Sequence, residues 1–471
     1  MKTALRLTVA AFALAAFNLT AATLYVSLDS ANPTPPYATW ATAATNIQDA
    51  VDAAKAGDTV VVTNGVYAVG SRDVGIGPSR VTVTNSIRLE SVNGPLVTVV
   101  QGEHQDENGG EGARCVCLAT DAVLSGFTLT NGIAPGGGGV WCSSTDAIVT
   151  NCVIANNGAS MGGGVCRGTL YRCTLTGNGG KGVGGAWNST LHDCTLTGNS
   201  GITSGGASGC TLHNCTLTGN SPGSGGGFYN CIVTENEGGI SGTAYNCIVT
   251  GNSGGSDGTF YNCTVIDNEG GISGTAFNSI IYYNAGGNYV EGTTLNFSCT
   301  TPLPTNGIGN IAGPPLFMDL AAGDFRLRED SPCIDAGTNL LGMTWTYGTA
   351  TWDPDTGEEI MAVGHISDPT DLLGNTRFID GNGDGKVAWD IGAYEFNSFK
   401  PPRFAVQPQL TADGWKLNIT GAADRWARLE RSANLKDWEQ VWSGFMGAEG
   451  VQQVSDGDTG QGLMFYRVVV P

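Results

Sequence analysis

A short phrase repeats eight times between Asn151 and Asn284, and its spacing restricts the chain to a stacked architecture. Each copy has a cysteine, or a serine in the last copy, followed five residues later by an asparagine. Successive copies are 21, 21, 21, 16, 16, 16 and 16 residues apart. A period this short indicates supersecondary units that stack, because one unit cannot bury its apolar face without its neighbours.

Each repeat contains a short run of β-branched and leucine residues, such as residues 173–176, and a glycine cluster, such as residues 162–164. Runs of three or four residues are too short for a helical pattern and predict strands. At ~3.3 Å per residue, sixteen residues give a contour of roughly 50 Å, enough for one coil of three brief strands. A repeat of twenty-one residues enlarges one corner of such a coil.

Stacked coils place equivalent residues ~4.8 Å apart, so identical side chains form files along the stack. The asparagine file is expected to be a ladder of hydrogen-bonded amides. It consists of Asn157, Asn178, Asn199, Asn220, Asn236, Asn252, Asn268 and Asn284. The cysteine file is expected to fill the interior as small hydrophobic residues. It consists of Cys152, Cys173, Cys194, Cys215, Cys231, Cys247 and Cys263, with Ser279 in the eighth copy.

Disulfides along the cysteine file are disfavoured, because parallel side chains in register point the same way. The better candidates for pairing lie outside this file, although no connectivity can be derived. They are Cys115, Cys117, Cys142, Cys166 and Cys210.

An aromatic column precedes each cysteine by two positions, and an apolar column precedes it by three. The aromatic column comprises Tyr171, His192, His213, Tyr229, Tyr245, Tyr261 and Phe277. Two adjacent apolar columns place a corner here, so one of them faces outward. The favoured interpretation puts the aromatic column in the core. The alternative puts it outside, where it could contact sugar rings as a ligand-binding surface.

Residues 124–132, 136–140 and 151–154 resemble the opening coils of right-handed parallel β-helix proteins of the pectin-lyase-like kind. The resemblance covers roughly residues 45 to 300. It implies an all-β fold, a right-handed parallel β-helix solenoid. It implies no particular activity, because this fold hosts lyases, hydrolases, tail spikes and adhesins.

The amino-terminal part is expected to contain a signal peptide at residues 1–22, because a basic start precedes an alanine-rich apolar run. Residues 23–114 then form an amino-terminal cap and the first coils, and residues 115–300 form the β-helix rungs. An amphipathic helix over residues 45–55 places Ile47, Ala50, Val51 and Ala54 on one face. Such a helix would cover the open end of the stack.

The carboxy-terminal part is expected to contain two further modules. Residues 301–398 resemble the choice-of-anchor Q module that closes many bacterial β-helices, on the phrases at 313–319, 324–327, 331–337 and 390–395. This likeness implies a secreted envelope protein. Residues 399–471 alternate polar and apolar positions between turns, which predicts a small β-sandwich.

The net charge of −20 disfavours nucleic acid as a partner, because no cluster of Lys and Arg is present to displace phosphate counterions. No segment after the signal peptide is long and apolar enough to span a membrane. The chain is therefore expected to be secreted, extracellular or associated with the cell surface. Its expected partners are polysaccharide or cell-envelope components, and its oligomeric state stays open.

One calcium site is predicted at residues 380–386. Asp380, Asn382 and Asp384 supply oxygens at the first, third and fifth positions of an EF-hand-like loop that continues to Lys386. The bidentate carboxylate expected at position twelve is replaced by Ile391, and Asp390 comes one residue early. The alternative is a turn that ties down the cap.

Two sets of side chains are candidate catalytic groups. Glu235 and Glu237 flank one ladder asparagine, and Asp267 and Glu269 flank another two rungs away, roughly 9.6 Å from the ~4.8 Å spacing. That separation approaches the one used by inverting glycosidases, but solvated turn charges are the favoured interpretation. A second pair, His192 and His213, could bind a metal or act as acid and base, but a stacked column explains it better.

The favoured function is a non-catalytic surface scaffold that contacts glycans or serves structurally. The alternative is a polysaccharide lyase or glycoside hydrolase that acts along a groove of the β-helix, with residues 101–114 as one wall. A functional groove would concentrate charged and aromatic side chains on one exposed face.

Overall fold

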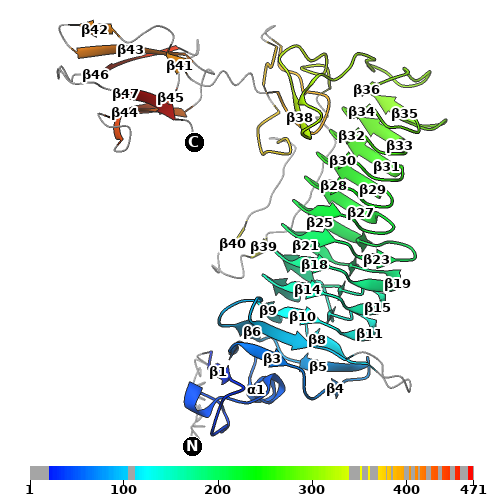
Figure 1. The fold of residues 1–471 in the computed structure, drawn as a ribbon, viewed down its shortest axis with the longest axis vertical. Helices are drawn as coiled ribbons and strands as arrows, with labels where there is room; N and C mark the ends of the chain where they lie inside the picture. Colours follow the sequence, from blue (N-terminus) through cyan, green and yellow to red (C-terminus); the bar gives the residue numbers. More distant parts are fainter. Residues whose placement is uncertain are drawn as a thin grey trace, which may run out of the picture.

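The computed structural model describes residues 21–103 and 112–338, with parts of the remainder. Those parts are residues 351–352, 359–360, 370–377, 379–382, 386–396, 403–404, 409–411, 414–420, 426–432, 438–445, 451–456 and 465–469. Most of the expected signal peptide and most of the proposed wall at 101–114 lie outside the described residues. Within them the chain forms a tall stack of parallel coils, a parallel β-helix (Figure 1). The predicted all-β fold class is confirmed.

Two long parallel sheets run the length of the stack. Sheet A consists of β1 (Thr23–Val26), β2 (Thr59–Val62), β6 (Arg88–Ser91), β9 (Val123–Ser125), β13 (Ile148–Thr150), β17 (Thr169–Tyr171), β21 (Thr190–His192), β25 (Cys210–His213), β27 (Ser224–Tyr229), β29 (Ile240–Tyr245), β31 (Ser256–Tyr261), β33 (Ile272–Phe277) and β35 (Thr294–Asn296). Sheet B consists of β3 (Gly65–Tyr67), β7 (Thr98–Gln101), β10 (Thr128–Thr130), β14 (Val153–Ala155), β18 (Thr174–Thr176), β22 (Thr195–Thr197), β26 (Thr216–Thr218), β28 (Ile232–Thr234), β30 (Ile248–Thr250), β32 (Thr264–Ile266), β34 (Ile280–Tyr282) and β36 (Cys299–Thr300).

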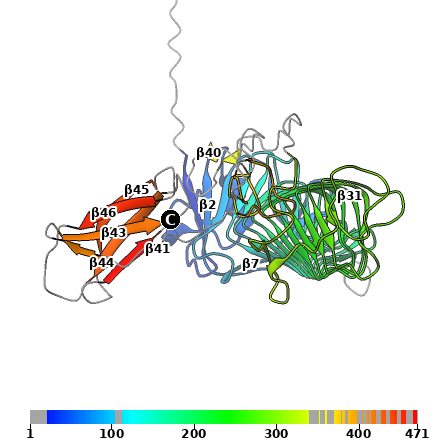
Figure 2. The ribbon, with the colours of Figure 1, turned by 90° about the horizontal axis from the view of Figure 1, so that it is seen from above.

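Two shorter sheets form the remaining sides of the long coils (Figure 1). Seen from above, the successive coils lie over one another (Figure 2). Sheet C consists of β4 (Arg72–Asp73), β5 (Pro78–Val83), β8 (Arg114–Leu118), β12 (Val140–Cys142), β16 (Val165–Cys166), β20 (Ala186–Trp187) and β24 (Ala207–Ser208). Sheet D consists of β11 (Ile133–Gly136), β15 (Gly158–Met161), β19 (Gly179–Val183) and β23 (Ser200–Gly201). The 21-residue coils thus have separate strands in sheets C and D, where a single enlarged corner was expected.

The 16-residue coils contain two strands, not the three that were predicted. One strand of six residues, such as β29, and one of three, such as β30, suffice. The long strand is continuous because a glycine sits in its middle at a positive φ, as at Gly242 and Gly258. A Cβ atom on Gly258 would collide with the carbonyl oxygen of Gly242 in the coil below. Only glycine therefore allows this close approach of the two backbones.

A single residue in the left-handed region turns each coil from sheet A into sheet B. These residues are Asn151, Arg172, Asp193, Asn214, Asn230, Asn246, Asn262 and Asn278, with φ between 48 and 53°. Asparagine and aspartate adopt this conformation more readily than other non-glycine residues. The residue before each cysteine of the file, most often asparagine, therefore has a conformational role.

The predicted amide ladder is confirmed. From Asn157 to Asn284 each side-chain Nδ2 donates to the Oδ1 of the next ladder residue over 2.8–3.2 Å. Each backbone N–H donates to the same Oδ1 over 2.9–3.1 Å. Asn288 extends the ladder by one place, and its Nδ2 donates to the Thr301 carbonyl. All eight predicted amides are buried and satisfied, as buried polar groups require.

The cysteine file lies in the interior, as predicted, and all fourteen cysteines are buried free thiols. The suggestion of pairing among the five other cysteines is therefore wrong for this structure. Register explains the outcome, because Cys117 and Cys166 both lie beside Trp141, and Cys142 lies beside Leu118. The remaining two thiols donate hydrogen bonds, Cys115 to the Thr130 carbonyl and Cys210 to the Ala186 carbonyl.

The amino-terminal end of the stack is covered by α1 (Ile47–Ala53), which follows the short helix η1 (Trp40–Thr42) (Figure 1). Asn46 caps α1 by accepting a hydrogen bond from the Asp49 N–H. The predicted apolar face is confirmed, because all four residues assigned to it are buried. The helix packs against β1, β2 and β5.

Toward the other end of the stack lies a closing module that contains the antiparallel pair β37 (Phe317–Asp319) and β38 (Asp324–Leu327). It packs on the outer face of the last sheet B strands, where it forms a second apolar cluster that includes Ile266, Ile280 and Phe317. Buried Arg377 contacts Glu395 of the module over 3.2 Å and donates to Asn246 of the β-helix. The likeness of the closing module to the choice-of-anchor Q module stays a prediction.

The remaining described strands are antiparallel. They are β39 (Thr351–Trp352), β40 (Glu359–Ile360), β41 (Arg403–Phe404), β42 (Gln409–Thr411), β43 (Gly414–Thr420), β44 (Trp426–Ser432), β45 (Glu439–Phe445), β46 (Val451–Asp456) and β47 (Phe465–Val469). Strands β41–β43 with β46, and β44, β45 and β47, form two sheets that contribute to one apolar cluster around Leu417, Leu429 and Val454. None of the described helices has the length and apolarity needed to cross a bilayer.

Candidate functional site

The aromatic column lies on the outer face of sheet A, and the favoured assignment to the core is wrong. The buried column is its neighbour, which includes Leu170, Leu191 and Phe228. The rings of the aromatic column are half-buried, except that Tyr171 is buried at the amino-terminal end of the column. Side chains alternate along a strand, so the two adjacent columns face opposite sides of the sheet.

The rings of this column stack face to face on one another. Successive centroids from Tyr171 to Phe277 are 4.8–5.4 Å apart, with interplanar angles of 4–14°. A sugar ring binds to an aromatic face, but here each internal face already contacts the next ring. The column therefore presents ring edges outward, and the alternative of a glycan-stacking platform is not supported either.

The two histidines are part of this stack, with 4.8 Å between their ring centroids. Burial, and then the neighbouring His213 ring, lower the pKa of His192 to about 4. Burial also lowers the pKa of His213. Both rings are therefore neutral at pH 7. They stack in the column in the same way as its tyrosine rings.

The four acidic candidates lie on exposed turns after sheet B strands. Glu235 and Asp267 occupy the left-handed corner position, with φ of 56° and 55°, and the register of β28, β30 and β32 places them two rungs apart. Glu237 accepts a hydrogen bond from the Ser221 hydroxyl, and Glu269 is also exposed. The predicted spacing in rungs is therefore present, and all four side chains are exposed.

The predicted calcium loop is only partly described, because Asp384 lies outside the described residues. Asp380 is half-buried, whereas Asn382 and Lys386 are exposed. Asp390 is fully buried, and its carboxylate accepts hydrogen bonds from the N–H groups of Asp335 and Phe396. Burial raises the pKa of Asp390, so this carboxyl group serves the module's own backbone.

Asp335, which the sequence did not single out, lies against the calcium loop. Its carboxylate accepts the N–H groups of Gly381 and Asn382, and burial followed by the charge of Asp380 raises its pKa. Two neighbouring carboxylates suit a hard cation chemically. The described residues contain no group of three or more His, Cys, Asp and Glu side chains that could hold a metal ion. Calcium binding stays a prediction.

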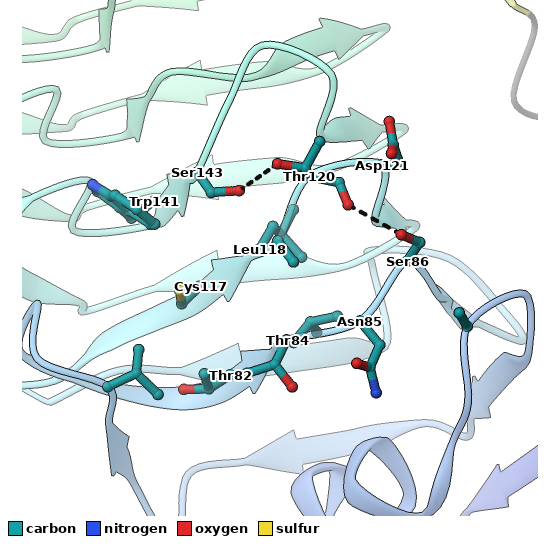
Figure 3. Close-up of a pocket in the computed structure, with 14 residues that line it drawn as sticks. Thr82, Thr84, Asn85, Ser86, Cys117, Leu118, Thr120, Asp121, Trp141 and Ser143 are labelled. Carbon is teal, nitrogen blue, oxygen red and sulfur yellow. Dashed lines mark hydrogen bonds between the residues drawn. The ribbon is translucent and has the colours of Figure 1, made fainter.

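A hollow of about 550 Å³ lies on the outer face of sheet C, near the amino-terminal end of the stack. Figure 3 shows Cys117 and Leu118 at its centre, between Trp141 on one side and Thr82 and Thr84 on the other. Its polar rim includes Asn85, Ser86, Thr120, Asp121 and Ser143. Hydrogen bonds tie the rim together, from the Ser86 hydroxyl to the Thr120 carbonyl and between the Thr120 and Ser143 hydroxyls.

Trp141 belongs to an outward file of sheet C in which residues of different size alternate. Register places Cys117, Trp141, Cys166, Trp187 and Ser208 one above another. The tryptophans are therefore two rungs apart, roughly 9.6 Å at the ~4.8 Å strand spacing, and do not stack on each other. Burial raises the pKa of the Cys117 and Cys166 thiols in this file, so these cysteines stay protonated and are poor nucleophiles.

Sequence reasoning missed this file. The available signal was the position of both tryptophans, each of which follows a glycine pair and one apolar residue in a long repeat, at 138–141 and 184–187. Glycine clusters drew attention to the corners, but the strand that follows each of them decides what the outer face presents.

Neither the family models nor the curated proteins contain a match to this chain. Among solved structures, the pectate lyase Pel9A has 15% identity and a TM-score of 0.39, covering 80% of this chain and 97% of its own. A rhamnogalacturonan lyase has 12% identity and a TM-score of 0.34, covering 64% and 92%. A pectin methylesterase mutant in complex with a hexasaccharide has 12% identity and a TM-score of 0.23, covering 59% and 79%. At these scores the likenesses do not bear on activity, and the strand order itself defines the fold.

Proposed function

We propose that this protein is a secreted, non-catalytic β-helix scaffold that contacts neutral glycans through the outer face of sheet C. The observation that carries the proposal is the sheet C hollow. It combines the ring of Trp141, free of a stacked aromatic neighbour in its file, with hydroxyl and amide groups on the rim. An aromatic surface beside a few directional polar groups is the usual composition of a ligand site.

The charges of the hollow favour a neutral ligand over an acidic one. Among the described residues that line it, Asp121 is the one carboxylate, and none is cationic. The whole chain has a net charge of −20, which repels a uronate-rich polymer further. Glycoside hydrolysis needs two carboxylates, so the same lining disfavours catalysis in this hollow.

Binding to a glycan array followed by titration calorimetry tests the proposal. Trp141→Ala is expected to weaken binding of the best glycan at least tenfold, about 1.4 kcal/mol, because the apolar contact surface is removed. The matched control is Trp40→Ala, since Trp40 is 45% exposed on the amino-terminal cap. This variant is expected to bind as the parent does, and both should melt within a few degrees of it.

Assays for reducing ends and unsaturated products distinguish the scaffold from an enzyme. The scaffold predicts no turnover of any polysaccharide in the array. Turnover that is lost in Glu235→Gln or Asp267→Asn would overturn the proposal in favour of a hydrolase or lyase on the sheet B turns. Equal glycan affinity of Trp141→Ala and the parent would place the contact elsewhere.

A further inference from the structure

Two buried thiols belong to the apolar cluster where the closing module packs on the last coils. Cys299 begins β36 and pairs in register with Ile280 of β34. Ile280 belongs to the outer apolar cluster, whereas its neighbour Ile281 belongs to the interior of the coil. Cys299 therefore points outward from sheet B, toward the module. Cys333 comes from the module and belongs to the same outer cluster.

Several contacts bring the segments that carry the two cysteines together. The Cys299 thiol donates to the Gly313 carbonyl over 3.1 Å. A Cβ atom on Gly313 would lie 3.2 Å from the Pro332 side chain, next to Cys333 in the chain. The Ser331 hydroxyl donates to the Pro315 carbonyl over 2.6 Å and accepts the Cys333 N–H over 3.2 Å. Both thiols are fully buried, and both belong to the same apolar cluster.

This pair differs from the cysteine file inside the coils. In the file, side chains leave adjacent parallel strands in the same direction, whereas a disulfide needs a dihedral angle near 90° about its S–S bond. Cys299 and Cys333 instead approach from two segments that face each other across a packed interface. The two residues do not lie on paired strands, so strand register does not force their Cα–Cβ bonds to be parallel.

We propose that Cys299 and Cys333 form a disulfide that fastens the closing module to the end of the β-helix. The oxidant is a dithiol oxidoreductase in its disulfide form or a small-molecule disulfide. While the module is undocked and its cysteines are exposed, one cysteine loses its proton, and the thiolate attacks the oxidant's disulfide to give a mixed disulfide and a thiol. The second cysteine thiolate then attacks the first sulfur and releases the reduced oxidant. In total the two cysteines lose two protons and two electrons.

A glutathione redox buffer tests the proposal without relying on export of the chain. The purified full chain is equilibrated with oxidised glutathione, denatured with an alkylating reagent present, and mapped by mass spectrometry. The expected result is one cross-linked peptide pair joining Cys299 to Cys333, with the other twelve of the fourteen cysteines alkylated. Alkylation of all fourteen, or a cross-link between other cysteines, would overturn the proposal.

Limited proteolysis then measures what the cross-link does. Release of the closing module is expected to be at least tenfold slower for the oxidised chain than for the reduced chain. The double variant Cys299→Ser and Cys333→Ser should lose this difference. Cys263→Ser is the matched control and should keep it, because serine already occupies the equivalent file positions 279 and 298. A redox effect that persists in the double variant would assign it to other thiols.

Discussion

At the scale of single residues, the stack depends on polar groups that are buried and fully paired. The asparagine ladder satisfies backbone groups of two coils at once, because each Nδ2 also donates to a backbone carbonyl of the preceding coil. A buried group left without a partner costs about 1–3 kcal/mol, so each ladder residue removes several such costs. Because each coil has these backbone groups to satisfy, asparagine recurs at the same position of every repeat.

Asn220→Ala is expected to lower the free energy of unfolding by at least about 3 kcal/mol, measured by urea denaturation. The Asn220 side chain donates to the Leu196 carbonyl and to Asn236, and it accepts from Asn199, so all three partners lose a bond. The control is Asn214→Gly, at an exposed left-handed corner that glycine adopts freely. A change within ~0.5 kcal/mol is expected there. Equal losses in the two variants would contradict a specific role for the ladder.

The stacked histidines predict a loss of stability in acid. The pKa of His192 is lower in the folded chain, about 4, than its ordinary value of 6.5, so the unfolded chain binds the proton more readily. The contribution of His192 is therefore complete above pH 6.5 and is lost as the pH falls toward 4. The loss should be roughly 2 kcal/mol, because each pKa unit is worth 1.36 kcal/mol and solvent screens the half-buried ring.

His192→Tyr is expected to flatten this pH dependence, since tyrosines already occupy the same column at positions 171 and 229. Urea denaturation at several values between pH 7 and pH 4 measures it. Adding His213→Tyr should flatten the curve further, because burial lowers the pKa of His213 as well. An unchanged acid slope in the double variant would assign that slope to groups outside the column.

At the scale of the element, each 16-residue coil is a unit that can be removed whole. Strands β28 and β30 pair Ile232 with Ile248, so deletion of residues 232–247 joins equivalent points of successive coils. Asn230 then takes the place of Asn246 beside the closing module. The shortened chain is expected to fold and to melt in one cooperative transition followed by circular dichroism, because nearest-neighbour interfaces are preserved.

Deletion of half a coil, residues 232–239, is the matched control. It moves sheet A residues onto sheet B and breaks the strand register of both sheets. This chain is therefore expected to aggregate or to lose its cooperative transition. Cooperative melting of both deletions would show that register between coils is not what stabilises the stack.

At the scale of the whole molecule, the predictions that succeeded are those set by repetition. The period, the amide ladder, the interior cysteines and the capping helix follow from patterns along the chain, such as the buried face of residues 47–54. Predictions that depended on direction failed or stayed open. The aromatic column was assigned to the core because its composition suits burial, but composition does not say which way a strand faces.

The sheet C hollow could not be read from the sequence because its walls come from three coils. Thr82, Cys117 and Trp141 lie on β5, β8 and β12, and the distances between them along the chain follow no period. The presence of Cys299 and Cys333 in one apolar cluster has the same origin, since it depends on how the closing module folds back onto the last coils.

The sequence by itself therefore determined the repeating coil and what fills it, because hydrogen bonds between identical coils depend only on recurrence. The tertiary structure decided which side chains face outward, which aromatic rings cover one another's faces by stacking, and which distant segments pack together. Those outcomes depend on the direction of each Cβ atom and on the path of the chain between coils, and neither is encoded in a period.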